Sequence, residues 1–302
     1  MIPPILKVPD SYREEHIEKK RIYPLIDKHL EAILYEFSTK GLSLPIAIID
    51  ESAFVNSYSG SIIRDFKSKT INHITSSKRN SIQGLDSFNR VDVIQGCSQF
   101  IDDLYVMYGC DKIQILENEY KYHYRLFPNT VPKQAGLLDP NSHLILSCPF
   151  TNGSVHLQMD SILKECTVKN IKVHLDMAWL TAAKDIKIDL SNPCIESVGL
   201  SLSKGYGLSG WNRIGLRLKK QDEPDTISLM TDFLQTPSIP MLVGSYFLDR
   251  LSPDHLWDNH EANYYKICRD FNLAPTNTIH VGISNGYVHG ISPLLRYLEY
   301  NN

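Results

Sequence analysis

The chain has 302 residues, of which 42% are hydrophobic and 22% charged, proportions typical of a globular protein with a sizeable core. Its 31 basic and 34 acidic residues give a formal net charge of -3, which argues against nucleic acid or an anionic membrane as a partner. No apolar run approaches the roughly 18 residues of a membrane span, and the N-terminus shows no secretion signal. We therefore expect a cytoplasmic protein with no nucleic-acid and no membrane partner.

The N-terminal third of the chain shows weak patterns. Residues 11–39 have apolar side chains at helical spacing, with Ser11 as N-cap, Gly41 as stop and a possible break at Pro24. The segment 55–88 is polar and rich in serine, lysine and asparagine, which predicts surface loops and a weak helix. No internal repeat interrupts the chain.

From residue 90 onward, short apolar runs alternate with helical stretches. Five runs are predicted to be strands: VDVIQG, KIQILE, HLILSCPF, IKVHLDMAW and IESVGLSLSK. Two stretches between them are predicted to be helices: SQFIDDLYVMYG and MDSILKECTVKN. This alternation predicts an α/β fold with a mostly parallel sheet flanked by helices. In such sheets ligands bind at the carboxyl ends of the strands.

Several predicted strands end in side chains that can do chemistry. Singly these residues are weak evidence, because serine, asparagine and glycine are common in turns. Their order along the chain is more informative. The strand-end residues are Cys97, Ser98, Gln99, Tyr120, Asn152, Asp176, Trp179, Ser201, Ser203 and Lys204.

The stretch SLSKGYGLSGWNRIG, residues 201–215, carries the most specific motif. It resembles the Ser-x-Ser-Lys-x-x-Gly-Leu-x-Gly-x-Arg-x-Gly signature of fold-type I pyridoxal 5′-phosphate (PLP) enzymes of the class I/II aminotransferase group. The resemblance extends over about residues 90–270, because VIQGCSQFIDDLYVMYG, ENEYKYHY, LSCPFTNGS and VHLDMAW are similar, in the same order, to further motifs of that group.

The resemblance implies a division of the chain into three parts and a homodimer with its active site at the interface. Residues 1–85 would form an N-terminal helical segment with loops, and residues 86–235 a PLP-binding large domain of the PLP-dependent transferase type. Residues 236–302 would form a reduced C-terminal small domain, shorter than is usual for the group.

The resemblance also assigns roles to single residues. Lys204 would form the Schiff base with PLP, and Asp176 would hold the charge of the pyridinium nitrogen, which makes the ring an electron sink. Tyr120 would stack on the ring, and Asn152 and Trp179 would lie near its phenolic oxygen. The phosphate would be held by a helix N-terminus, hydroxyls and a guanidinium. Its ligands would be Cys97, Ser98, Gln99, Ser201, Ser203 and Arg213.

The sequence departs from the motif pattern in two places near the cofactor and the substrate. Arg213 lies nine positions after Lys204, one more than the pattern has, so either Arg213 or Asn212 could face the phosphate. His280 stands where the group carries an arginine for the substrate carboxylate, and a neutral imidazole is no substitute for that guanidinium. His280 could contact substrate or be a core histidine.

Two further substrate assignments are weaker. Arg64, Arg125 or another residue could replace the carboxylate-binding arginine. Tyr58, in a predicted loop, could reach the partner subunit's phosphate, as a tyrosine does in relatives.

The expected function follows from the resemblance. It is a PLP-dependent aminotransferase that acts on an amine or an unusual amino acid through Lys204. A PLP-dependent lyase, decarboxylase or racemase is the first alternative, because the same cofactor serves all these reactions. A non-catalytic protein that kept the fold is the second. PLP is the only cofactor expected. The six cysteines include no C-x-x-C pair, so we expect buried, reduced thiols and no metal.

Overall fold

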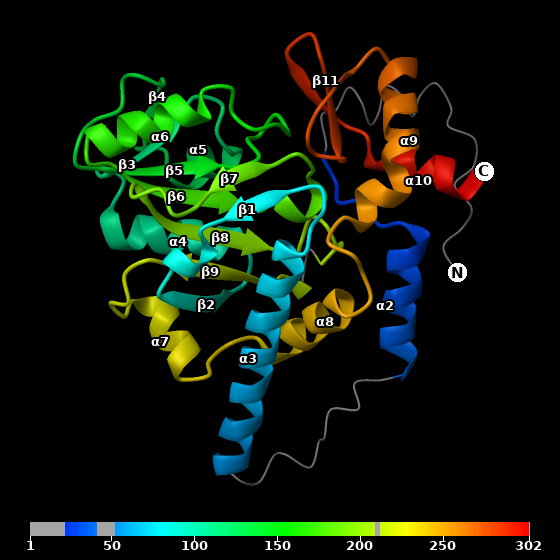
Figure 1. Ribbon diagram of the computed structural model, residues 1–302, viewed down its shortest axis with the longest axis horizontal. Helices are drawn as coiled ribbons and strands as arrows, with labels where there is room; N and C mark the ends of the chain where they lie inside the picture. The colour runs from blue at the N-terminus through cyan, green and yellow to red at the C-terminus, as the bar shows by residue number, and fades with distance from the viewer. Residues whose placement is uncertain (1–21, 41–51, 209–211, 302) are drawn as a thin grey trace.

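The computed structural model describes residues 22–40, 52–208 and 212–301 (Figure 1). A seven-stranded sheet with the order β2-β9-β8-β6-β5-β3-β4 forms its centre. All neighbouring pairs are parallel except those of β9, which runs against both β2 and β8. The predicted α/β class with a mostly parallel sheet is confirmed. The strands are β2 (Arg90–Ile94), β3 (Ile113–Leu116), β4 (Pro132–Lys133), β5 (His143–Ser147), β6 (Lys172–Met177), β8 (Ile195–Ser201) and β9 (Gly215–Lys219).

Successive side chains of a strand point to opposite faces of the sheet. Here both faces are apolar, and each packs against its own hydrophobic cluster. Ile145 of β5 belongs to the cluster that contains α4 (Cys97–Tyr108), whereas its neighbours Leu144 and Leu146 belong to the larger cluster on the other face. Helices α3 (Ser52–Thr75) and α6 (Met159–Val168) contribute to that larger cluster. Both helices lie in front of the sheet in Figure 1.

The expectation of loops and a weak helix in residues 55–88 was wrong, because α3 is a continuous helix of 24 residues. Ile62, Phe66, Thr70 and Ile74 recur every four residues and are all buried. This stripe packs against α8 (Ser238–Leu248), and the two helices lie side by side in Figure 1. The many serines and lysines of α3 obscure the stripe in the sequence, since they dilute its apolar content.

Helix α2 (Lys28–Lys40) is the described part of the helix predicted for residues 11–39. Residues 22–27, which include Pro24, are not helical, and Ser11 and Gly41 lie outside the described residues. Asp27 caps α2 by accepting a hydrogen bond from the Leu30 amide at 2.8 Å. The other oxygen of the Asp27 carboxylate lies 2.8 Å from His255 Nε2 and 2.9 Å from His260 Nε2, so this buried group joins α2 to α9 (His255–Asp270).

The C-terminal part of the chain builds a small second sheet. Strands β10 (Ala274–Pro275), β11 (Val281–Ser284) and β12 (Tyr287–Gly290) are antiparallel, and α10 (Ser292–Asn301) packs against α9. Figure 1 shows these elements on one side of the central sheet. The boundaries of the three predicted parts, near residues 85 and 235, stay predictions.

The remaining short elements and the cysteines complete the fold. β1 (Ser81–Gln83) pairs in parallel with β7 (Lys187–Asp189). Helix α5 (Lys121–Leu126) lies between β3 and β4 in the chain, and α7 (Thr226–Asp232) lies between β9 and α8. All six cysteines are free, and five of them are buried, as predicted. They are Cys97, Cys110, Cys148, Cys166, Cys194 and Cys268. In the part of the chain that the structure describes, no helix is both long and apolar enough to cross a membrane.

A buried charge network anchors β9, the reversed strand. Arg217 is 1% exposed and pairs with Asp92 at 2.6 Å, Asp103 at 2.9 Å and Asp225 at 2.6 Å. Removal of one partner from a buried ion pair costs about 3–5 kcal/mol, because it leaves uncompensated buried charge. We therefore expect Arg217→Met to lower the free energy of unfolding by about that amount.

Guanidinium-induced unfolding measures this effect. Lys133→Met is the control, because Lys133 pairs at 2.9 Å with a single exposed partner, Asp139. Its expected cost is below about 1 kcal/mol. Equal costs for the two variants would contradict the interpretation of Arg217 as a structural anchor.

Candidate active site

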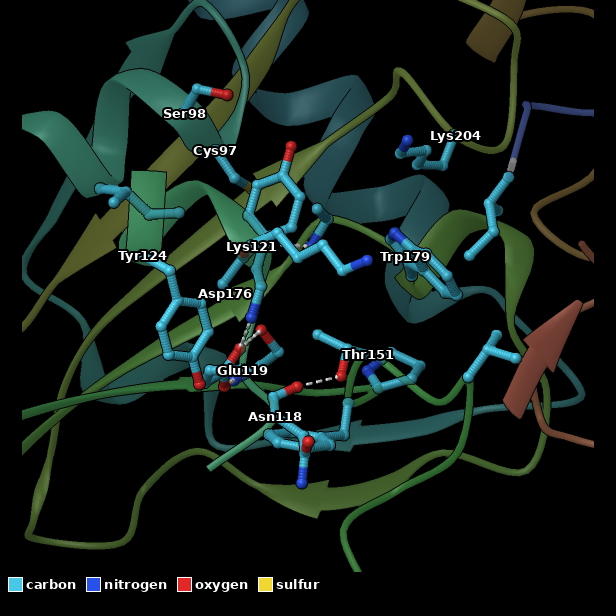
Figure 2. Close-up of a pocket in the computed structure, with 18 of the residues that line it drawn as sticks. Cys97, Ser98, Asn118, Glu119, Lys121, Tyr124, Thr151, Asp176, Trp179 and Lys204 are labelled. Carbon is cyan, nitrogen blue, oxygen red and sulfur yellow. Dashed lines mark hydrogen bonds between the residues drawn. The ribbon is translucent and has the colours of Figure 1, made fainter. Parts of the chain in front are cut away.

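A cavity of about 1250 Å³ opens at the carboxyl-terminal edge of the central sheet (Figure 2). Five parallel strands end there, and the reversed strand β9 begins there, with Gly215 opposite both Ile94 and Ser201. Residues that are far apart in the sequence therefore meet at one edge. Of the sequence-predicted site residues, the following line the cavity: Cys97, Ser98, Tyr120, Asp176, Trp179, Ser201, Ser203, Lys204 and Arg213.

Lys204 follows β8 by three residues and reaches the cavity from a partly buried position. Burial lowers the pKa of its amine, and the positive charge of Arg213 lowers it further, whereas Asp176 opposes the shift. A lysine with a lowered pKa is more often neutral, and only the neutral amine is nucleophilic. A hydrogen bond fixes the backbone of Lys204 on the side away from the cavity, since its carbonyl oxygen lies 2.9 Å from His280 Nε2.

Asp176 is the penultimate residue of β6, where it lies beside Ser147 of β5 and Gly199 of β8. Its side chain is 6% exposed and accepts a hydrogen bond from the Ala178 amide at 2.9 Å. Burial raises the pKa of the Asp176 carboxyl, although hydrogen bonds from Cys97 and Ala178 and the charge of Lys204 oppose this. No described lysine or arginine forms an ion pair with Asp176, although its carboxyl group lines the cavity. A cation bound in the cavity would therefore stabilise the ionised form of this buried group.

A cradle for an anion lies where α4 begins. Arg213 Nη2 donates to Ser98 Oγ at 2.6 Å, and Ser201 Oγ lies 3.0 Å from Ser203 Oγ. Gly96 precedes the helix with a φ of 78°, and a Cβ there would come within 3.3 Å of Arg213 Nη2 and 3.5 Å of Ser201 Oγ. Hydroxyls, a guanidinium and a helix N-terminus thus surround a space that glycine keeps open, a donor set that fits a phosphate.

The structure places the two residues left open by the sequence differently. Arg213 is exposed toward the cavity and reaches Ser98 despite the extra residue in the motif. Asn212 is 6% exposed and is not among the residues that line the cavity.

Two aromatic residues face the cavity from different strands. Tyr120 follows β3 and is 44% exposed, with its ring parallel to that of Tyr122 at a centroid distance of 5.8 Å. Trp179 follows β6 and lies near Lys204 in the view of Figure 2. Both positions suit contact with a flat ring at the centre of the cavity.

Three predicted residues whose side chains the structure describes are absent from the cavity lining. Gln99 accepts a hydrogen bond from the Gln95 amide at 2.7 Å, and Asn152 accepts one from the Ser154 amide at 3.0 Å, so both side chains stabilise local turns. His280 is fully buried behind Lys204. Tyr58 falls in helix α3 instead of the predicted loop, and its side chain lies outside the described ones.

Sequence reasoning missed a buried carboxyl group beside the predicted ring-stacking residue. Glu119 accepts hydrogen bonds from the Ser147 amide at 2.6 Å, the Ser147 hydroxyl at 2.7 Å and the Tyr120 amide at 2.7 Å. Burial raises the pKa of Glu119 to about 7, against the effect of these donors. Its three hydrogen bonds join the ends of β3 and β5. The signal available in the sequence was an acidic residue two positions after the predicted strand KIQILE.

Other lining residues come from α5 and from the small sheet. Lys121, Tyr124 and Arg125 of α5 line the cavity, as do Glu117 and Tyr287. Arg125 was one of the two arginines considered for a substrate carboxylate. The other, Arg64, is exposed on α3 and is not among the lining residues.

Burial lowers the pKa of His280 to about 3, so the folded protein holds this imidazole neutral. The unfolded chain has the ordinary histidine pKa of about 6.5, and the unfolded state therefore binds more protons between these values. The contribution of neutral His280 to stability is complete above about pH 6.5 and is lost as the pH falls toward 3.

We expect the stability difference between the wild type and His280→Gln to shrink as the pH falls from about 7 to about 5, because glutamine does not titrate. Urea unfolding of both proteins across this range measures it. A difference independent of pH would contradict a neutral His280 in the folded state.

The sheet order, the reversed strand and the strand-end cavity define an α/β protein with the fold of PLP-dependent enzymes. Comparison with solved structures confirms the fold that the resemblance of residues 201–215 implied. No family model and no curated protein sequence matches the chain.

Three solved structures illustrate the likeness. The PLP-bound C-S lyase from Staphylococcus hominis is 11% identical with a TM-score of 0.58, over 92% of this chain and 77% of that one. L-threonine-O-3-phosphate decarboxylase from Porphyromonas gingivalis is 13% identical with a TM-score of 0.55, over 83% and 80%. Tyrosine aminotransferase from Leishmania infantum is 12% identical with a TM-score of 0.54, over 78% and 88%. These three enzymes have different reactions, so the likeness describes the fold alone.

Proposed function

We propose that this chain is a PLP-dependent enzyme that acts on a small amino compound, by transamination as the first candidate reaction. The observation that carries the proposal is that Lys204, Asp176 and the Arg213–Ser98 cradle line the same cavity. These are the three groups that PLP needs in a protein: an amine for its aldehyde, a carboxylate for its pyridinium nitrogen and a site for its phosphate.

The residues that would hold PLP follow from the donor set of the cavity. Ser98, Ser201, Ser203 and Arg213 would bind the phosphate, and Asp176 the ring nitrogen. Tyr120 and Trp179 would contact the ring and its substituents. When bound, PLP supplies an electron sink that stabilises negative charge on the substrate carbon.

Lys204 would both bind the cofactor and move a proton. Its Nζ has a lowered pKa because of burial and of Arg213, so the neutral amine can take a proton from the substrate carbon and return it. Asp176 stays beside Ser147 at the end of β6, where its negative charge balances a cation inside the cavity. His280 positions Lys204 through the backbone carbonyl oxygen.

A PLP-dependent lyase, decarboxylase or racemase is the alternative, since a C-S lyase and a decarboxylase are among the proteins of similar fold. A non-catalytic protein that binds PLP is the third candidate. PLP stabilises the same kind of carbanion in all these reactions. The residues that surround the substrate therefore determine which of its bonds is broken.

Reconstitution with PLP tests the proposal. We expect the purified protein, after PLP addition and gel filtration, to keep the visible absorbance of PLP that is bonded to a lysine amine. A panel of amines and amino acids would then be offered as donors. Formation of pyridoxamine phosphate supports transamination, whereas loss of carbon dioxide, sulfide or a β-substituent supports the alternative. A protein that keeps no PLP contradicts the proposal.

We also propose that the protein is a homodimer, because active sites of this fold lie at a subunit interface. Its proposed location is the cytoplasm. Sedimentation measures the assembly. A monomer that still binds PLP would remove the dimer from the proposal and leave the cofactor assignment in place.

A further inference from the structure

The charged side chains that line the cavity divide into those with a partner and those without. Lys204, Arg213 and Asp176 are assigned to the cofactor by the proposed function. Glu119 accepts three hydrogen bonds, and Glu117 accepts one from Gln134 Nε2 at 3.2 Å. The cations that remain are Lys121 and Arg125.

Lys121 and Arg125 lie four residues apart on α5, on the same side of the helix. Both are exposed and line the cavity, and neither forms an ion pair or a side-chain hydrogen bond with any residue that the structure describes. Figure 2 shows the Lys121 side chain extending into the cavity on the side of Trp179. The pair thus gives this wall of the cavity two positive charges that form no ion pair with a described residue, although the carboxylate of Glu117 lines the same cavity.

We propose that Lys121 and Arg125 bind a carboxylate of the substrate, so that the substrate class is an amino acid and not a simple amine. This inference rests on the proposed function and supplies the anion site that His280 cannot provide. A guanidinium matches a carboxylate through two parallel N–H···O bonds, and a lysine adds a mobile charge that can follow the ligand.

The environment of His280 leaves it no free ring nitrogen at the cavity for a substrate carboxylate. His280 is fully buried and neutral, and its Nε2 is committed to the Lys204 carbonyl oxygen. Lys121 and Arg125 are reached from the opening of the cavity. In this proposal the substrate carboxylate binds to side chains of α5, and not to the C-terminal segment that contains His280.

The first experiment compares two probes on the PLP-loaded protein. Aminooxyacetate carries a carboxylate and O-ethylhydroxylamine does not, and either one attacks the aldehyde carbon of PLP and displaces the Lys204 amine, which abolishes the visible band. We expect the wild type to react preferentially with aminooxyacetate. Lys121→Gln and Arg125→Gln should each reduce that preference about tenfold. Lys187→Gln, on the exposed surface of β7, should leave it unchanged.

The second experiment needs no cofactor. Mass spectrometry would follow acylation of lysine amines, with and without propionate in the buffer. We expect propionate to protect Lys121 and not Lys187. An unchanged probe preference in both variants, or equal protection of the two lysines, would overturn the inference. Failure of the proposed function has a different signature, since the protein would then keep no PLP while the protection of Lys121 could still be measured.

Discussion

Lys204→Ala is expected to abolish the retention of PLP through gel filtration and the visible band that marks its bond to an amine. The reason is chemical, because alanine offers no nitrogen to the aldehyde carbon. Non-covalent contacts from the Arg213 cradle and Asp176 would remain, so PLP should still bind reversibly. Absorbance spectra before and after gel filtration measure the two effects separately.

Lys187→Ala is the matched control, because Lys187 is exposed on β7 and does not line the cavity. Far-ultraviolet circular dichroism would show that Lys204→Ala folds, as expected for a side chain whose structural contact is made by its backbone oxygen. A visible band that persists in Lys204→Ala would place the covalent bond on another lysine, of which Lys121 is the candidate in the cavity lining.

Asp176→Asn is expected to have opposite effects on reactivity and on stability. Asparagine has nearly the same shape but no charge, so it cannot keep a pyridinium nitrogen protonated, and the electron sink weakens. We expect the rate of reaction with amino donors to fall by about a hundredfold or more, equivalent to at least about 2.7 kcal/mol in the barrier. Stopped-flow absorbance after donor addition measures this rate.

The stability of the PLP-free Asp176→Asn protein should rise at neutral pH. Burial raises the pKa of Asp176, which means that its ionised form costs folding free energy above that pKa. Removal of the charge should therefore raise the free energy of unfolding, while the Ala178 amide keeps an oxygen acceptor. Asp270→Asn, on the exposed end of α9, should change neither quantity. A variant with lower stability and unchanged reactivity would show that Asp176 has only a structural role.

The elements of the large sheet were predictable from the sequence because their signals are local. Apolar runs of four to seven residues mark β3, β5, β6 and β8, and the helices between them carry their own periodicity. Strand β9 was missed, because Arg217 and Lys219 interrupt its apolar pattern, and Arg217 is acceptable there only through three aspartates from other segments. Helix α3 was predicted only as a weak helix among loops, because its buried stripe lies among serines and lysines.

The motif of residues 201–215 and the place of Lys204 in it can be read from the sequence, because both are local patterns. The expectation that strand-end residues meet at one edge follows from the parallel sheet that the sequence predicts. Which side chains face the cavity became visible in the folded chain. Arg213, one position beyond the expected place, reaches Ser98, whereas Asn152 and Gln99 turn to their own backbone and His280 lies behind Lys204. The physical reason is that strand order and side-chain direction depend on contacts between residues far apart in the chain, and these leave no local pattern in the sequence.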